Sequence, residues 1–340
     1  MKLRSAVLTL LCLGWGTVAT GQGVTRVGTS AAAFLRIPAG TKGTAMGGAF
    51  TALADDGSAA FWNPGAAGRQ DKNGLFIHHS DWLPGLEYDF VALTLPLRQY
   101  GVVGIDIVSL RSGEMEVTTL DAPMGTGETY TSSSTAVGLL YARSLTDRFS
   151  IGVNLKYVNE QIFHSSAGGF AFDIGTLFIT PFKGIRLGVN VANVGTRLRM
   201  QGEDLNSYVD IAPNQQGNND EIVAALKTDY FILPIILRLG LAWDWILSPG
   251  SRLTLACEGV NPNDDAQSVN LGIEYAVLNN MLMLRGGYSE LLLKESSKGW
   301  TFGAGLDVAA FAGVKMRIGY AWQDFKYLGA VNHFSVDLTF

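Results

Sequence analysis

Long apolar runs are what this sequence most clearly lacks. Beyond the first twenty residues no stretch reaches the roughly 18 consecutive apolar residues that a spanning helix needs, so a helical membrane protein is not expected. Charged residues are also few, at 16% of 340 residues, against about 25% in an ordinary soluble domain. Part of the surface is therefore expected to face something other than water. The net charge of -5 gives no basic footprint for nucleic acid, which is not expected as a partner.

The N-terminus has the pattern of a secretory signal peptide. Lys2 and Arg4 precede a largely apolar stretch over residues 6–18, and small residues follow at 19–21. This order predicts a signal peptide over residues 1–21, cleaved before Gln22. The alternative, an N-terminal membrane anchor, is disfavoured because the stretch is short for a hydrocarbon core of about 30 Å.

Cysteine is scarce, with only Cys12 and Cys257. Cys12 has no Leu-small-small sequence before it, so lipid attachment is not expected. Cleavage of the signal peptide would leave one thiol, which cannot form an internal disulfide. The stability of the mature chain must then come from backbone pairing and packing.

What the sequence does have, from about Asn73 onward, is alternation of apolar residues with polar or small ones, the period of a strand with two different faces. In the last segment the apolar face carries Phe334, Val336, Leu338 and Phe340. In other segments the polar face carries six cations: Lys156, Arg186, Arg238, Arg285, Lys315 and Arg317. We expect these cations to line a wet lumen, opposite a lipid-facing surface.

About fourteen such segments occur, and the links between them alternate in length. The short links are expected at 97–100, 144–147, 180–184, 247–250, 277–280 and 310–313. The long links are expected at 81–86, 111–131, 161–167, 195–233, 261–267, 290–298 and 324–330. Transmembrane barrels place short turns in the periplasm and long loops outside. The pattern predicts an all-β transmembrane fold, a roughly 14-stranded antiparallel outer-membrane β-barrel over residues 69–340.

A soluble β-sandwich is the alternative, since it also shows alternation and tight turns. Its solvated face would tolerate the six cations equally well. The opposite face of the strands distinguishes the two folds. It is almost free of charge along all the strands, and a sandwich would have to bury all of it in one unusually large core. Closure into a barrel also removes sheet edges, which lipid does not tolerate. A barrel of this width needs a filler.

Residues 22–68 lack the strand period and are predicted to form that filler, a plug of short helices and turns. Its distinctive stretch, residues 47–65, reads GGAFTALADDGSAAFWNPG. Small residues there allow the plug backbone to approach the wall, while Asn63 and Pro64 make a rigid turn through a local hydrogen bond and a fixed dihedral. We expect Asp55 and Asp56 to cap a helix or bind luminal arginines rather than catalyse. A structural role for the Asp55, Asp56, Trp62, Asn63, Pro64 and Gly65 motif is favoured over a direct ligand role.

This stretch resembles the signature of the FadL superfamily, in which an N-terminal hatch ends with Asn-Pro-Ala before the first strand. Gly65 stands where that pattern has Ala, a small-for-small change. The chain looks closest to the PorV/PorQ branch, whose members belong to the type IX secretion system of Bacteroidetes-like bacteria. Further segments that are similar to that branch lie at 79–85, 141–147, 152–157, 173–176 and 284–288. The resemblance implies a plugged outer-membrane barrel.

The end of the chain also points to the outer membrane. Phe334, Val336, Leu338 and Phe340 resemble the C-terminal signal by which such barrels engage the insertion machinery. With the signal peptide, it predicts a multi-pass β-barrel in the cell outer membrane, with outer-membrane lipid and that machinery as partners.

Motifs of enzyme chemistry are missing, including Gly-x-Ser-x-Gly, the phosphate-binding loop and His-Glu-x-x-His. His78 and His79 are adjacent and would face opposite ways in a strand, while His164 and His333 look isolated, so no metal, cofactor or catalytic residue is expected. A lipid-processing Ser-His site stays open as an alternative, because such sites are assembled from different strands.

Two functions follow from the resemblance. The preferred one is type IX secretion, in which the barrel binds exported proteins with type IX C-terminal domains, or passes them to the surface attachment machinery. The alternative is a FadL-like passive transporter of long-chain fatty acids or other hydrophobic small molecules. A candidate apolar contact in the longest loop suits either a hydrophobic ligand or an apolar partner, and could equally be a short amphipathic helix over the barrel mouth. Its residues are Ile222, Val223, Leu226, Tyr230 and Phe231.

Overall fold

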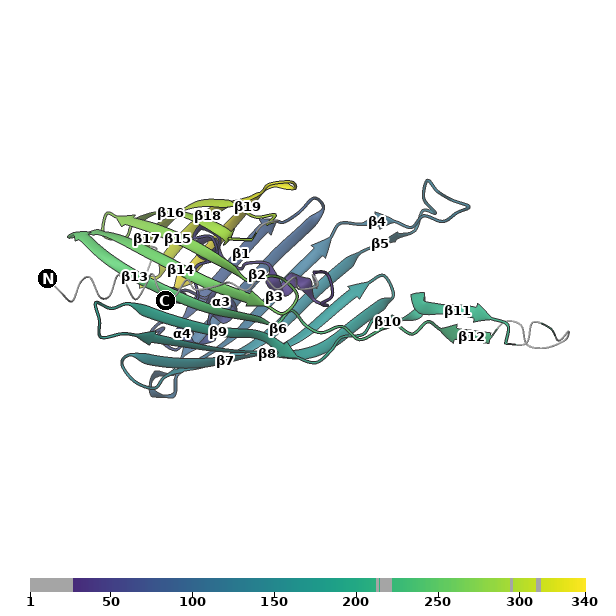
Figure 1. Cartoon of the computed structure of the whole chain (residues 1–340), viewed down its shortest axis with the longest axis horizontal. Coiled ribbons are helices and arrows are strands. Elements are labelled where there is room, and N and C mark those ends of the chain that lie inside the picture. Colours follow the sequence, from purple (N-terminus) through teal and green to yellow (C-terminus); the bar gives the residue numbers. More distant parts are fainter. Residues whose placement is uncertain (1–26, 212–213, 215–221, 294–295, 310–312) are drawn as a thin grey trace.

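Fourteen strands form one closed antiparallel barrel in the computed structural model (Figure 1). The structure describes residues 27–211, 214, 222–293, 296–309 and 313–340, so the predicted signal peptide lies outside the described residues. Each barrel strand pairs with its neighbours along the chain, and β1 pairs with β19 to close the ring. The strands are β1 (Gly74–Asp81), β2 (Leu86–Pro96), β3 (Val102–Ser112), β6 (Ser132–Ser144), β7 (Phe149–Ile162), β8 (Ser165–Ile179), β9 (Arg186–Gly195), β13 (Ile236–Ser248), β14 (Ser251–Pro262), β15 (Ser268–Val277), β16 (Leu282–Leu291), β17 (Trp300–Ala309), β18 (Lys315–Phe325) and β19 (Gly329–Thr339). The predicted fold class is confirmed.

The two faces of the wall differ as the period-two pattern predicts. Ile105, Leu139 and Leu155 lie side by side on β3, β6 and β7 and are 50%, 58% and 51% exposed. Their neighbours Leu140 and Ala142 point inward and are buried. A continuous apolar outer surface of this kind is unfavourable in water, and lipid is the solvent that suits it. Among the described residues, no helix is long and apolar enough to cross a membrane.

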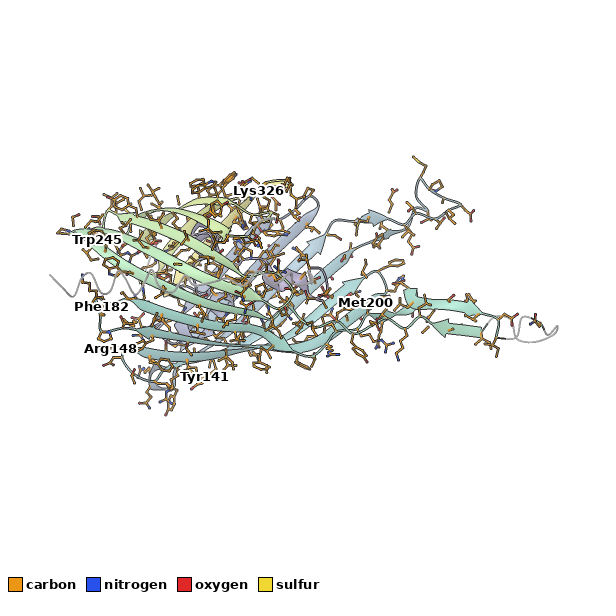
Figure 2. All side chains as sticks on the ribbon, in the orientation of Figure 1. Tyr141, Arg148, Phe182, Met200, Trp245 and Lys326 are labelled. Atoms are coloured by element: carbon orange, nitrogen blue, oxygen red, sulfur yellow. The ribbon has the colours of Figure 1, made fainter. Side chains whose placement is uncertain are left out.

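The two ends of the barrel also differ. One end carries the short links, including η2 (Arg98–Tyr100), and near it lie the aromatic side chains of Phe182 and Trp245 (Figure 2). At the other end two hairpins project away from the wall (Figure 1). Their elements are β4 (Met115–Glu116) with β5 (Thr129–Tyr130), and β11 (Asn206–Val209) with β12 (Ile222–Ala225), the second being preceded by β10 (Gln201–Gly202) and η3 (Glu203–Leu205). By the usual rule for such barrels, the short-link end is periplasmic.

Two predicted long loops are wrong. In place of the loop expected at 324–330, only residues 326–328 join β18 to β19. The chain was expected to leave the wall at residues 161–167, but β7 continues to Ile162 and β8 starts at Ser165. Phe163 adopts a left-handed φ of 50°, which allows a two-residue turn. β8 has 15 residues and is therefore about 50 Å long. At the usual tilt this exceeds an apolar band of about 25 Å, so these strands extend outward beyond the lipid.

Residues 27–68, the described part of the predicted plug, lie inside the barrel. They form four short helices: η1 (Ala33–Arg36), α2 (Thr41–Ala45), α3 (Ala59–Trp62) and α4 (Pro64–Ala67). None exceeds five residues, and isolated helices of this length are unstable in water. Contacts with the wall must therefore hold the plug in shape. We refer to residues 27–68 as the plug below.

A charge on the outer face should be costly at mid-strand. Leu139→Arg is expected to lower the free energy of unfolding by about 2–4 kcal/mol, because its guanidinium would lie in hydrocarbon. Denaturant titration of the protein in lipid vesicles measures this. Leu120→Arg is the matched control, since Leu120 is fully exposed in the outer β4–β5 hairpin. Equal stability of the two variants would contradict a lipid-facing wall.

Candidate functional site

Plug backbone and wall backbone meet directly at pairs of interior glycines. Gly188 of β9 lies opposite Gly240 of β13, and the plug segment Thr51–Ala52 covers both. A Cβ added to Gly188 would lie 2.8 Å from the Ala52 Cα, and one added to Gly240 would lie 2.9 Å from the Ala52 nitrogen. Two further pairs of glycines receive the plug in the same way. They are Gly272 with Gly287 against Met46 and Gly47, and Gly152 with Gly175 against Pro64 and Gly65. The plug is thus seated in notches that have no side chains.

Asn63 connects the plug to the wall. Its side-chain nitrogen donates to the carbonyl of Thr51 at 2.8 Å and to that of Thr176, on β8, at 2.9 Å. Its side-chain oxygen accepts from the Gly65 amide at 3.0 Å. Pro64 is the first residue of α4, where its missing N–H costs nothing. The predicted local bond is present, and the sequence could not show the two additional ones.

Gly65 is more constrained than a small-for-small exchange suggests. A Cβ at this position would lie 2.7 Å from both the Gly175 carbonyl carbon and the Thr176 Cα. The glycine is therefore needed for close approach in this chain. Trp62, also in the predicted motif, is buried and donates its indole N–H to the Ala39 carbonyl at 2.6 Å.

Asp55 and Asp56 have different partners. Lys42, itself in the plug, donates to Asp55 at 2.9 Å. Desolvation inside the barrel acts to raise the pKa of Asp55, but the charges of Lys42, Arg317 and Arg186 outweigh it and hold the pKa well below its usual value. Asp56 accepts from the amide and the hydroxyl of Ser58, just before α3. Burial and the adjacent Asp55 charge raise the pKa of Asp56.

Most of the predicted cations of the inner wall are paired with carboxylates. Lys156, Arg238 and Arg285 are buried, which corrects the prediction that they line water. Five of the six predicted cations have an acidic partner on the wall: Lys156–Asp173, Arg186–Asp244, Arg238–Glu258, Arg285–Glu274 and Arg317–Asp307. Lys315 is exposed at the start of β18. Arg285 and Glu274 are direct cross-strand neighbours, a relation that needs the strand register and was missed.

Glu258 is the most consequential of the missed residues. One carboxylate oxygen accepts the backbone amides of Phe50 and Thr51 at 2.9 and 2.8 Å. The other lies 3.9 Å from the Arg238 guanidinium. Arg238 in turn covers the rings of Phe61 and Trp62 at 5.5 Å. This wall pair therefore holds two separate parts of the plug.

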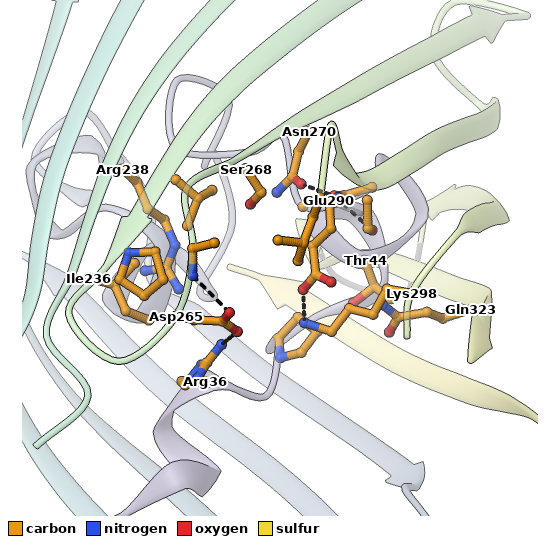
Figure 3. Close-up of a pocket in the computed structure, with 18 of the residues that line it drawn as sticks. Arg36, Thr44, Ile236, Arg238, Asp265, Ser268, Asn270, Glu290, Lys298 and Gln323 are labelled. Carbon is orange, nitrogen blue, oxygen red and sulfur yellow. Dashed lines mark hydrogen bonds and ion pairs between the residues drawn. The ribbon is translucent and has the colours of Figure 1, made fainter. Parts of the chain in front are cut away.

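An outer cavity lies between the plug and the outer half of β13 to β18 (Figure 3). Its lining is rich in charge: Arg36 pairs with Asp265 at 3.0 Å and Lys298 with Glu290 at 2.7 Å. Arg238 and Trp62 form its floor. Its volume is about 80 Å³, smaller than the roughly 150 Å³ cavity that holds benzene in an engineered protein.

An inner cavity of about 260 Å³ lies on the side of the plug that faces the short links. Plug residues Leu53, Asp55 and Asp56 form one wall, and Arg186 and Asp337 project from β9 and β19. The plug separates this cavity from the outer one.

The predicted apolar loop contact is not part of either cavity. Ile222 and Val223 lie in β12, which pairs with β11 in the projecting hairpin (Figure 1). The alternative of a short helix over the mouth is therefore wrong. Tyr230 lies under the Arg199 guanidinium, and Phe231 forms a bridge with Leu198. Leu226 is exposed.

The histidines are less isolated than expected. His78 and His333 stack with ring centroids 5.4 Å apart, on the inner faces of β1 and β19. Only the pairing of the first and last strands brings them together, which sequence spacing does not reveal. His164 lies 3.2 Å from Asp204. Among the described residues, no group of three or more His, Cys, Asp or Glu is placed to hold a metal ion.

This chain is similar to known proteins in its fold and not in its sequence. The sequence matches no family model and no curated protein. Solved structures do match. The toluene transporter TbuX of Ralstonia pickettii gives a TM-score of 0.52 at 12% identity, covering 88% of this chain and 97% of TbuX. The Pseudomonas putida toluene transporter TodX gives 0.52 at 14% identity, covering 88% and 96%, and a Pseudomonas aeruginosa FadL homologue gives 0.50 at 11%, covering 88% and 97%.

The chain shares its fold with these FadL-like barrels. This agrees with the superfamily resemblance of residues 47–65. The narrower resemblance to PorV/PorQ remains a prediction, as do the role of the C-terminal residues in insertion and the signal peptide. In β19, Phe334 points outward and is exposed, and the backbone of Phe340 pairs with Asn73.

A methyl group on Gly65 should disturb the seating of the plug in this FadL-like barrel. Gly65→Ala is expected to lower the free energy of unfolding by about 1–3 kcal/mol, the usual cost of overpacking. Gly113→Ala is the control, because a Cβ there has nothing within 4 Å. Urea titration in detergent compares the two. No difference between them would show that plug and wall are not in backbone contact.

Loss of Lys42 should destabilise the plug in a pH-dependent way. The folded pKa of Asp55 is depressed, so its contribution is present above the ordinary carboxyl pKa of about 4 and is lost as pH falls below it. Lys42→Met is expected to cost about 1–3 kcal/mol at pH 7, less at pH 3. Because half of the Asp55 side chain is exposed (53%), solvent screens the pair, and we expect a loss at the low end of this range. Lys72→Met is the control. If Lys42→Met lowered the free energy of unfolding equally at pH 7 and pH 3, the pairing of Lys42 with Asp55 would be refuted.

Proposed function

We propose that this protein is a passive outer-membrane channel for hydrophobic small molecules. The observation that carries the proposal is a closed barrel that holds a plug in its lumen, with plug residues lining one cavity on each side. A lumen of this width cannot be filled by wall side chains alone, and a movable filler fits a transported substrate better than a purely structural barrel. The fold shared with two toluene transporters supports the same function.

The charged outer cavity bears on the kind of substrate. Arg36, Arg238 and Lys298 line it together with Asp265 and Glu290. A hydrocarbon gains little from such groups, whereas a hydrophobic molecule with a polar head, such as a long-chain fatty acid, can bind both the charges and Trp62. We therefore place fatty acids ahead of unsubstituted aromatics.

The role in type IX secretion ranks second. It depends on the PorV/PorQ resemblance, and none of the contacts described above bears on it. If it held, deletion of the gene would leave proteins with type IX C-terminal domains in the periplasm.

Uptake by intact cells tests the channel. A Gram-negative host without its own FadL-like channels, expressing this protein, is expected to take up radiolabelled oleate about tenfold faster than the empty host, and toluene more slowly than oleate. Leu120→Arg serves as the expression-matched control. Uptake of both compounds at the rate of the empty host would overturn the proposal.

A further inference from the structure

We propose that the route across the plug runs along the β9–β13 wall, with the plug segment Phe50–Leu53 as its gate and Glu258 as the latch. This inference depends on the proposed channel function. The moving part is residues 50–53, and the substrate passes along the β9–β13 wall. The remainder of the plug stays seated.

The β9–β13 wall is where the two cavities come nearest along paired strands. Arg238 lines the outer cavity and lies opposite Asn190, while Arg186 lines the inner cavity and lies opposite Ala242. Between these two inward-facing layers lies a single layer, Gly188 with Gly240. The layers of Arg238 and Ala242 are four residues apart on β13, or about 13 Å.

That separating layer has no side chains. The plug residues Thr51 and Ala52 lie directly on the two glycines, and Glu258 is the neighbour of Gly240 on β14. If this segment moves inward, the wall leaves an open notch that connects the cavities. On the β18–β19 wall, by contrast, Ala321 and Gly319 both intervene between Gln323 of the outer cavity and the layer of Asp337 in the inner cavity.

Two of the hydrogen bonds that hold the closing segment converge on one carboxylate. Glu258 accepts the amides of both Phe50 and Thr51. The carbonyl of Thr51 accepts from Asn63, which is anchored independently to β8. Release of the two amides from Glu258 therefore leaves the bond between Asn63 and the Thr51 carbonyl as a pivot about which the segment can turn, while Asn63 and α4 keep their own wall contact.

Buried polar atoms without partners lie on the same path. The side-chain amide of Asn190 is fully buried, and neither its oxygen nor its nitrogen has a hydrogen-bond partner among the described residues. The second oxygen of Glu258 also lacks a hydrogen bond. Unpaired buried polar atoms are unfavourable, and water or the polar head of a substrate would pair them once the segment moves.

Disulfide locks test the route, in a Cys257→Ser background. Ala52→Cys with Gly240→Cys joins the gate to β13, where the two Cβ atoms would be 3.3 Å apart. Thr41→Cys with Gly319→Cys joins the plug to β18 at 3.2 Å and is the matched control. Both distances are close to the roughly 3.5–4.5 Å of natural disulfides. Disulfide formation is verified by thiol titration, and oleate uptake is measured with and without reductant.

The route predicts that the 52–240 lock lowers uptake at least about tenfold, reversibly on reduction, because the open population is removed. The 41–319 lock should leave uptake within about twofold of the unlocked protein. Uptake that survives the 52–240 lock, or equal loss with both locks, would overturn the route alone. No uptake by the unlocked protein would overturn the channel function itself.

A second pair of variants covers poor folding of the locks. Glu258→Ala is expected to raise uptake about tenfold, equivalent to about 1.4 kcal/mol, since both gate amides lose their acceptor. Thr301→Ala is the control, because Thr301 donates to the Ala45 carbonyl and so removes a plug–wall bond on β17. Unchanged uptake in Glu258→Ala, or an equal rise in both, would contradict the latch.

Discussion

Direct contact between plug backbone and wall backbone is the constraint on which the rest of this structure depends. It requires glycine on adjacent strands at the same height, as in Gly188 with Gly240 and Gly152 with Gly175. It also requires small residues in the plug, such as Ala52 and Gly65. Because the plug helices have only four or five residues, the notches of the wall supply the order that the helices cannot supply themselves.

The second constraint is the pairing of cations with carboxylates on the inner wall. It explains how a plug can pack inside a barrel that is lined with cations. A buried guanidinium is tolerated only with a partner, and the wall provides Glu258 for Arg238 and Glu274 for Arg285. Glu258 does more than neutralise, since it also binds plug amides. The plug is thus held by hydrogen bonds at some positions and by close packing in the glycine notches at others. Such a combination allows one segment to be released while the remainder stays in place.

The strands of the wall could be predicted from the sequence, whereas the contacts inside the barrel could not. Alternation of apolar and polar residues predicts the strands because it reports burial directly, and the fourteen segments followed. Contacts such as His78 with His333, or Glu258 with Phe50, depend on which strands meet and in which register. The tight turn at Phe163 escaped prediction because a left-handed residue there carries no glycine signal. The apolar run at 222–225 was ambiguous, since four residues do not distinguish a strand from a helix.

Hydrogen exchange of the protein in lipid nanodiscs tests most directly whether the plug is seated on the wall. If the notches hold it, amides of residues 41–67 should exchange at rates close to those of the barrel strands and far more slowly than those of the outer hairpin, residues 113–128. Exchange of the plug as fast as that of the outer hairpin would contradict the account.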